Sequence, residues 1–179
     1  MKLSAVKEFE SPCGVLRIGA ADDCLCLCEW ANSKHRMHRG FEVGNSCESE
    51  IIDKAITELR MYFNGELTEF SVETEFYGTD FEKTVWKQLS EIPYGATVSY
   101  KEIAQAIGRP NSVRAVANAI GKNPISVICP CHRVIGSNGS LTGYDGGIDA
   151  KRYLLALEQQ RVSVQTELFG SFDSESIGT

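Results

Sequence analysis

Residues 100–122 read YKEIAQAIGRPNSVRAVANAIGK, and this stretch decides the fold that we expect for the second half of the chain. Apolar residues recur at helical spacing on both sides of a central turn: Ile103, Ala104 and Ile107 before it, and Val113, Val116, Ala117 and Ile120 after it. The turn is Gly108-Arg109-Pro110, and Asn111 or Ser112 caps the second helix. Two short helices joined in this way predict a helix–turn–helix. The pattern also fits a helical hairpin buried in a core, because this motif has many false positives.

The distribution of charge favours a surface that contacts nucleic acid in this half. Arg114, Asn118 and Lys122 lie at i, i+4 and i+8 on the polar face of the second helix. The chain of 179 residues has a net charge of −6, but eight basic and four acidic residues give +4 over 100–161, which leaves −10 for the remainder. The acidic remainder excludes a protein that binds nucleic acid over its whole surface, whereas a basic second half is typical of a local DNA-binding footprint.

The first 70 residues predict strands followed by a helix. The stretch 15–18 and the alternation of cysteine with leucine over 24–28 have strand character. Apolar residues then recur at helical spacing over 50–63, and Asn64-Gly65 ends that helix.

These elements together predict an α+β fold. Residues 71–79 read as a linker, after which Asp80 caps another helix. We therefore expect a small N-terminal α/β domain with an antiparallel sheet over 1–77. A mostly helical domain with the helix–turn–helix follows over 78–161, and the polar stretch 162–179 is expected to be a loosely ordered tail.

Composition predicts an intracellular protein. With 42% hydrophobic and 23% charged residues, the chain is ordinary for a globular protein. No apolar run approaches the roughly 20 residues that span a bilayer, and the first seven residues lack the apolar region of a signal peptide. Seven cysteines are an odd number for disulfides, and in a reducing compartment they are expected to be free thiols or ligands.

A thiol stands beside an imidazole at Cys131-His132, after a stretch, 125–129, that reads as a buried strand ending at Pro130. Arg133 adds a positive field that favours thiolate, and Glu158, near the expected end of a helix that Asp149 caps, could orient His132 as the third member of a Cys–His–acid relay. The dipeptide alone fits a buried structural cysteine and a satisfied loop histidine better, because short cysteine motifs transfer poorly between families.

Several further motifs occur in a fixed order around this dipeptide: Tyr94-Gly95, Ser99-Tyr100, Arg114-Ala115-Val116, Asn123-Pro124-Ile125, Pro130-Cys131-His132-Arg133-Val134-Ile135-Gly136 and Leu141-Thr142-Gly143-Tyr144. Together they resemble the O6-alkylguanine-DNA alkyltransferases, also called methylated-DNA–protein-cysteine methyltransferases. The resemblance is strong over 78–158 and is continued earlier by Ser11-Pro12-Cys13-Gly14 and Tyr62-Phe63-Asn64-Gly65.

The resemblance implies a DNA-repair protein that transfers the alkyl group of O6-alkylguanine, with O4-alkylthymine as a second candidate substrate, irreversibly to its own Cys131. His132 resembles the base, which acts through a water, and Glu158 the acid that orients it. Asn123 matches the asparagine that braces the active-site turn, and Tyr100 a phenol donor near the guanine leaving group.

The resemblance also implies how DNA is held. Arg114 matches the arginine that replaces the extruded base, on a helix that enters the minor groove and whose small Ala115 and Ala119 suit close approach. Further DNA contacts are implied for Asn118, Lys122 and Tyr100, and the positions of the guanine pocket fall on Val134, Tyr144, Asp145 and Ser126. The implied protein is a monomer without cofactor, acts on double-stranded DNA and not at a membrane, and is cytoplasmic, or nuclear in a eukaryote.

Two positions depart from the family pattern at the pocket. Asp145 puts a carboxylate where small residues are usual, and Ser126 stands where the human-type protein has proline, so substrate range is open on both counts.

The other cysteines raise a metal hypothesis. Soft ligands gather early in the chain: Cys24, Cys26 and Cys28 on one expected strand face, His35 and His38 nearby, and Cys13 and Cys47 as additions. The zinc site of some relatives falls on Ala21 and Cys26 here and does not carry over, so we predict no metal site.

Two other functions compete with alkyl transfer. One is a sensor that binds alkylated bases without transfer, and the other is a thiol oxidoreductase that uses Cys129 and Cys131.

Overall fold

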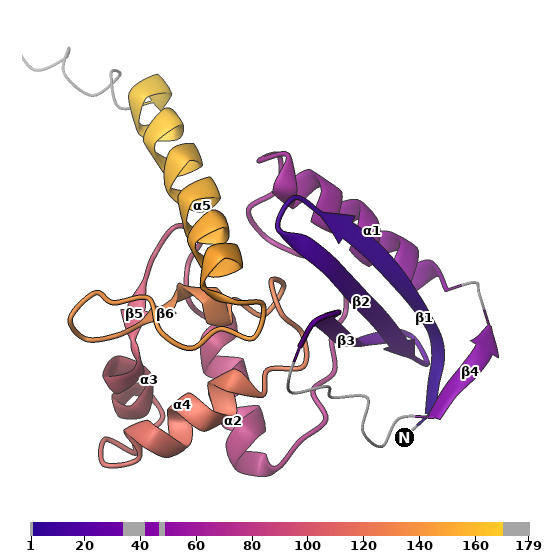
Figure 1. Ribbon diagram of the computed structural model, residues 1–179, viewed down its shortest axis with the longest axis horizontal. Helices are drawn as coiled ribbons and strands as arrows, with labels where there is room; N and C mark the ends of the chain where they lie inside the picture. Colours follow the sequence, from indigo (N-terminus) through magenta and orange to yellow (C-terminus); the bar gives the residue numbers. More distant parts are fainter. Residues whose placement is uncertain (1, 34–41, 47–48, 170–179) are drawn as a thin grey trace, which may run out of the picture.

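The computed structural model describes residues 2–33, 42–46 and 49–169. Its first half is a sheet covered by a helix, and its second half is mostly helical (Figure 1). The strands of the first half are β1 (Lys2–Ser11), β2 (Gly14–Ala21), β3 (Cys24–Trp30) and β4 (Glu42–Ser46), in the spatial order β3-β2-β1-β4. β1, β2 and β3 are antiparallel, as predicted, and β4 adds a parallel edge beside β1.

A β-bulge at Cys26 changes which side chains of β3 face the core. Ala20 pairs with Leu25, but Gly19 pairs with Leu27, so Cys26 is an extra residue and the alternation slips by one. Leu25, Cys28 and Trp30 therefore join the main core, whereas Cys26 and Leu27 pack on the opposite face. The prediction that Cys24, Cys26 and Cys28 share one face is wrong for this reason.

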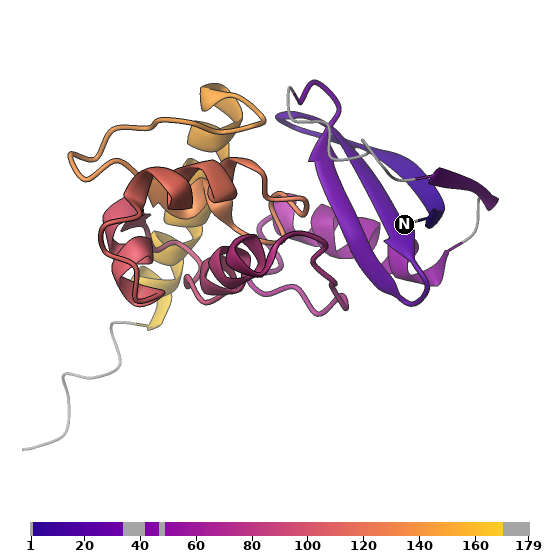
Figure 2. The same cartoon turned by 90° about the horizontal axis from the view of Figure 1, so that it is seen from below.

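Helix α1 (Glu50–Phe63) packs on the sheet and confirms the helix predicted over 50–63. The Ser49 side chain caps its start, and its end lies at Asn64, followed by Gly65 at φ +72°. Ile52, Leu59 and Tyr62 face inward and are buried. Figure 2 shows α1 running along one face of the sheet.

Helix α2 (Asp80–Ser90) begins the second half. Its cap is Thr79 and not Asp80, because Thr79 and Glu82 form a capping box in which each side chain accepts the other's backbone N–H. Glu82 also forms an ion pair with Lys122, whose Nζ lies 2.9 Å from Oε1 of Glu82. This contact connects the start of α2 to the end of α4 (Val113–Gly121).

The helix–turn–helix is present as α3 (Tyr100–Ala106) and α4, joined by a turn with Gly108 at φ +70°. Ser112 is the N-cap residue of α4, although its side chain makes no capping hydrogen bond. α4 is anchored on α2 by the indole of Trp86, which donates to the carbonyl of Ala119 at 2.8 Å. Ala119 is therefore buried, and the expectation that it approaches DNA is wrong.

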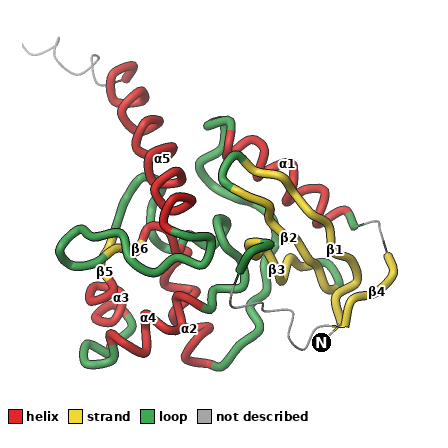
Figure 3. Tube along the Cα trace, viewed as in Figure 1, coloured by secondary structure: helices red, strands yellow, loops and turns green. Residues whose placement is uncertain are grey.

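The chain then passes through a long irregular segment that is broken only by short elements (Figure 3). These are a 3-10 turn η1 (Cys131–Arg133) and the strand β6 (Val134–Ile135), which pairs in parallel with β5 (Val98–Ser99).

Helix α5 (Ile148–Phe169) closes the fold and projects beyond it (Figure 1). The sequence predicted an end near Glu158 and a loosely ordered tail over 162–179, but the helix continues to Phe169 because no glycine or proline interrupts it. Residues 170–179 lie outside those described. Within the described residues, no helix has the length and apolar character needed to cross a membrane.

The two halves share one hydrophobic core and are joined by backbone hydrogen bonds. Cys28 of β3 donates to the carbonyl of Pro124 at 2.8 Å and accepts from the N–H of Ser126 at 2.7 Å. The edge strand β3 thus supports the segment that leads to Cys131.

The capping box makes the stability of α2 testable. Thr79→Ala leaves the N–H of Glu82 without its acceptor, so we expect the free energy of unfolding to fall by about 1 kcal/mol in urea titrations. Thr84→Ala removes the same atoms from an exposed position inside the same helix, where alanine is the better helix former, and should leave stability unchanged or slightly higher. Equal losses in the two variants would contradict the role of the cap.

Candidate active site

The segment before Cys131 is a tight turn and not the strand that the sequence predicted. The Asn123 side chain closes it: its amide N–H donates to the carbonyl of Cys129 at 2.8 Å, and its carbonyl accepts from the N–H of Ile125 at 3.1 Å. Val127 lies in the left-handed region at φ 72°, which is uncommon for a β-branched residue. The strain at Val127 and the buried amide together fix where the chain delivers Cys131.

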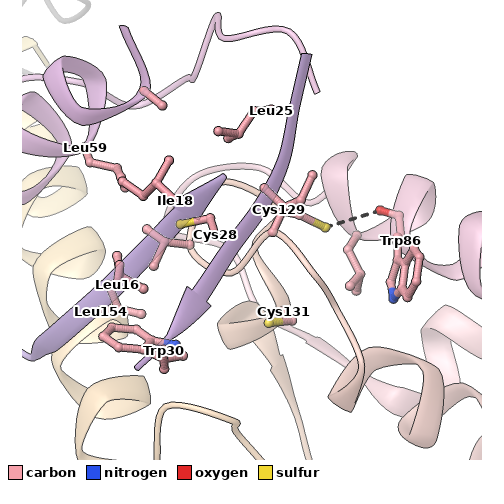
Figure 4. Packing of buried hydrophobic residues seen from close by; sticks show 14 of the residues in the cluster. Leu16, Ile18, Leu25, Cys28, Trp30, Leu59, Trp86, Cys129, Cys131 and Leu154 are labelled. Carbon is pink, nitrogen blue, oxygen red and sulfur yellow. Dashed lines mark hydrogen bonds between the residues drawn. The ribbon is translucent and has the colours of Figure 1, made fainter. Parts of the chain in front are cut away.

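The Cys131 thiol lies at the start of η1 and is 5% exposed. Figure 4 places it in the same cluster as Cys28 and Trp30 of β3 and near Cys129. Burial raises the pKa of Cys131 to about 11, an effect that Asn123 and Lys151 oppose and that the Asp145 carboxylate reinforces. At neutral pH the thiol is therefore protonated, and a base is required to form thiolate.

His132 and Glu158 supply such a base. Nε2 of His132 lies 2.8 Å from Oε1 of Glu158, and both side chains are fully buried. Since an ionised carboxylate only accepts, Nε2 carries the proton and Nδ1 carries the lone pair. Nδ1 has no hydrogen-bond partner within the described part of the chain. Burial lowers the pKa of His132 against the opposing effect of Glu158, so the ring is neutral and can accept a proton at Nδ1.

Arg133, which the sequence suggested as a source of positive field for the thiol, is paired with Glu158 in the structure. Its guanidinium is buried and paired with Glu158, with Nε 2.9 Å from Oε2, and it also donates to the carbonyl of Ile92. Burial alone would raise the pKa of Glu158, but His132 and Arg133 lower it to about 2. Arg133 therefore keeps Glu158 ionised.

The cation that acts on the thiol is Lys151 of α5, which sequence reasoning counted only as part of the basic surface. It is fully buried, and its Nζ donates to the carbonyls of Val134 at 2.6 Å and Thr142 at 3.0 Å. Burial lowers its pKa. The spacing of Lys151, Leu154 and Glu158 at i, i+3 and i+7 was the available signal, because it puts two charges on the buried face of one helix.

A cavity of about 880 Å³ opens between α4 and the loop before α5. Five of the predicted site residues line it: Tyr100, Arg114, Asn118, Tyr144 and Asp145. The hydroxyl of Tyr100 donates to the carbonyl of Thr142 at 2.9 Å. Cys131 does not line the cavity but belongs to the buried cluster against which Tyr100 and Tyr144 pack.

The other predicted pocket and DNA residues lie elsewhere. Ser126 is buried within the turn and Val134 within β6, and neither lines the cavity. Ala115 is exposed on α4, and Lys122 is held by its ion pair with Glu82.

The basic surface is smaller than the sequence count implied. Arg133 and Lys151 are buried, and Arg152 pairs with Asp149 at 2.7 Å.

The sheet supports one residue of the cavity wall, Tyr144, through a contact that sequence reasoning missed. The indole of Trp30, at the end of β3, donates to the hydroxyl of Tyr144 at 3.3 Å, with the rings edge to face. A Cβ on Gly146 would meet this indole at 2.5 Å, so glycine is required where the loop crosses it. A lone tryptophan at a strand end carries no sequence signal for this contact.

The cysteine-rich region does not gather into a metal site among the residues that the structure describes, where no group of three or more histidine, cysteine or acidic side chains could hold an ion. Cys13, Cys24, Cys26 and Cys28 are free thiols. His35, His38 and Cys47 lie outside the described residues.

Comparisons with family profiles match both halves of the chain. Residues 80–160 match the 6-O-methylguanine DNA methyltransferase, DNA binding domain, and residues 7–76 match the 6-O-methylguanine DNA methyltransferase, ribonuclease-like domain. The methylated-DNA–protein-cysteine methyltransferase of Mycolicibacterium paratuberculosis is 42% identical over 163 residues, which cover 91% of this chain and 97% of that protein. The one from Methanosarcina acetivorans is 45% identical over 152 residues, covering 84% and 95%.

Solved structures agree with the sequence comparisons. The O6-methylguanine methyltransferase of Mycobacterium tuberculosis superposes with a TM-score of 0.80 at 43% identity, over 93% of this chain and 99% of that one. The M. tuberculosis OGT in complex with DNA gives a TM-score of 0.77 at 44% identity, over 90% and 94%. The resemblance inferred from the motifs is confirmed.

The influence of Asp145 on the thiol can be measured directly. Asp145→Asn removes the negative charge that raises the pKa of Cys131, so we expect that pKa to fall below about 11. Alkylation by iodoacetamide should be severalfold faster at pH 8, because more thiolate is present.

Asp149→Asn makes the same chemical change at an exposed position and should leave the rate unchanged. A rate for Asp145→Asn equal to that of the unmodified protein would show that the carboxylate does not act on Cys131.

Proposed function

The chain belongs to the family of the 6-O-methylguanine DNA methyltransferases, whose members are named methylated-DNA–protein-cysteine methyltransferases, and from this premise we propose that Cys131 is the thiol that accepts the alkyl group. The protein repairs DNA by transferring the alkyl group of O6-alkylguanine to its own cysteine. The observation that carries the assignment to Cys131 is the Glu158–His132 pair, which presents an unpartnered Nδ1 on the residue next to Cys131 in the same buried 3-10 turn.

The chemistry begins with the thiol proton. His132 takes it at Nδ1, directly or through a bridging water, and the imidazolium so formed is stabilised by Glu158. The Cys131 sulfur then attacks the O6 alkyl carbon in line: an S–C bond forms, the C–O6 bond breaks, and the guanine leaves with the bonding electron pair and takes up a proton. Lys151 and Asn123 favour the thiolate before attack.

The alkylated base binds in the cavity between α4 and the loop before α5. The O6 carbon of a stacked guanine is out of reach, so the nucleotide must be flipped into the cavity that Tyr100 and Tyr144 line. The Tyr100 phenol can then donate to the departing ring, where negative charge develops. Arg114, at the exposed start of α4, fills the place of the extruded base, and Asn118 and Ala115 lie against the groove.

The thioether product explains why each protein molecule transfers only one alkyl group. A thioether has no route to hydrolysis under mild conditions, so each molecule reacts once. We assign the protein to the cytoplasm, or to the nucleus of a eukaryote, because the six cysteines in the described residues are all free thiols, as expected in a reducing compartment.

The central prediction concerns covalent transfer. After incubation with a duplex containing O6-methylguanine, the intact protein should gain the mass of one methyl group in exchange for one proton, and Cys131→Ser should gain none. Cys129→Ser removes the other thiol of the segment, which is buried with a strongly raised pKa, and should still be methylated. Binding without a mass gain would favour the sensor function, and reversible oxidation without binding the oxidoreductase.

Base extrusion gives a second prediction. Arg114→Ala should slow repair in a duplex by roughly 10- to 100-fold, because flipping costs a few kcal/mol that the arginine offsets. Reaction with the free O6-methylguanine base, which needs no extrusion, should change little.

Arg109→Ala removes an equal charge from the turn before α4, where Arg109 lies over the ring of Phe81, and should affect duplex repair far less. Equal slowing of duplex and free base by Arg114→Ala would contradict the extrusion role.

A further inference from the structure

Tyr62 connects the N-terminal half to the catalytic relay. It lies in the last turn of α1 and is fully buried, and the sequence motif Tyr62-Phe63-Asn64-Gly65 assigned it no role in the reaction. Its hydroxyl crosses to α5 and donates to Oε1 of Glu158 at 2.7 Å. The same hydroxyl lies 3.5 Å from Nε2 of His132.

The donors around Glu158 show why one more hydroxyl matters. Oε1 accepts from Tyr62, from His132 and from Arg133, and Oε2 accepts from Arg133 and from the N–H of Gly95. Tyr62 and His132 therefore share one carboxylate oxygen. Each donor to Oε1 draws negative charge away from the other hydrogen bonds of that oxygen.

The ring and the hydroxyl of Tyr62 have separable roles. The ring packs edge to face on Phe63 and Tyr94 and at a tilt on Phe70, and a phenylalanine would preserve these contacts. The hydroxyl adds only the contact to the relay. Burial and the adjacent Glu158 raise the pKa of Tyr62, so the phenol stays protonated and remains a donor throughout the working range.

We propose that Tyr62 is a positioning residue of the transfer reaction. Its hydroxyl holds Glu158 in place and weakens the hydrogen bond that Oε1 accepts from Nε2–H of His132. The proposal rests on the role of His132 as the base. Without the hydroxyl, Oε1 draws more strongly on the Nε2–H, and the imidazole binds a proton at Nδ1 more tightly. A larger fraction of the protein then has no lone pair to take the thiol proton at low pH.

The charged and titratable groups that face His132 come from four parts of the chain. Glu158 and Lys151 lie on α5, Arg133 and Cys131 on η1, Tyr62 on α1, and Tyr144 in the loop before α5 with its ring 6.5 Å away. Of these, Tyr62 and Tyr144 can each lose a hydroxyl without a change in net charge. The hydroxyl of Tyr62 contacts the His132–Glu158 pair, whereas that of Tyr144 contacts Trp30.

The test is the pH dependence of single-turnover methyl transfer from an O6-methylguanine duplex, with protein in excess. In Tyr62→Phe the acid limb of the profile should move to higher pH, so that transfer at a fixed pH on this limb is roughly tenfold slower while the high-pH plateau stays near that of the unmodified protein. NMR of the imidazole nitrogens of His132 should show its titration displaced in the same direction.

Tyr94→Phe is the matched control. It deletes the same atom from a ring 6.0 Å from that of Tyr62, and the hydroxyl of Tyr94 has no hydrogen-bond partner in the described part of the chain. Its profile should superimpose on that of the unmodified protein.

Three outcomes would overturn the proposal. They are an unchanged profile in Tyr62→Phe, a uniform loss of rate at all pH values, and failure of Tyr62→Phe to unfold cooperatively, which would show that the hydroxyl serves the fold. Failure of the proposed function is separate, because the unmodified protein would then transfer no methyl group.

Discussion

A single buried carboxylate organises the molecule. Glu158 has no contact with solvent, and an unpaired charge there would cost several kcal/mol. Its ionised form persists because donors from three other segments surround it: Arg133 and His132 of η1, Tyr62 of α1 and the backbone of Gly95. The interactions that stabilise the charge also bring the helical half, the N-terminal helix and the active-site turn into one fixed arrangement. Catalytic geometry and fold thus depend on the same contacts.

The electrostatic roles around the thiol divide between two residues of one helix. Lys151 and Glu158 both lie on the buried face of α5, two turns apart. Lys151 lowers the pKa of the Cys131 thiol, and Glu158 raises that of the His132 imidazole. Because both residues lie on one helix, the positions of the two charges are fixed relative to each other. Burial opposes thiolate in the free protein, and this protects a thiol that can react only once.

Sequence patterns were sufficient for the elements whose signals are local. The helix over 50–63 and the helix–turn–helix follow from apolar spacing and from turn residues, and both are present. The tight turn over 125–129 was missed because a short apolar run cannot distinguish a strand from a turn closed by a side chain six residues earlier. The partner of Arg133 was missed because Glu158 lies 25 residues away, and only the fold brings them together.

The bulge at Cys26 has a consequence for how the strand can change. Side chains of a strand alternate between the two faces of the sheet, and one extra residue reverses this alternation for every side chain that follows it. A regular β3 that kept the pairing of Ala20 with Leu25 would turn Cys28 and Trp30 outward and direct Leu27 and Glu29 to the core. The indole would then leave Tyr144, and an acidic residue would face the interior near Cys131. The extra residue in one strand of the N-terminal sheet therefore decides which side chain supports Tyr144, more than 100 residues later in the chain.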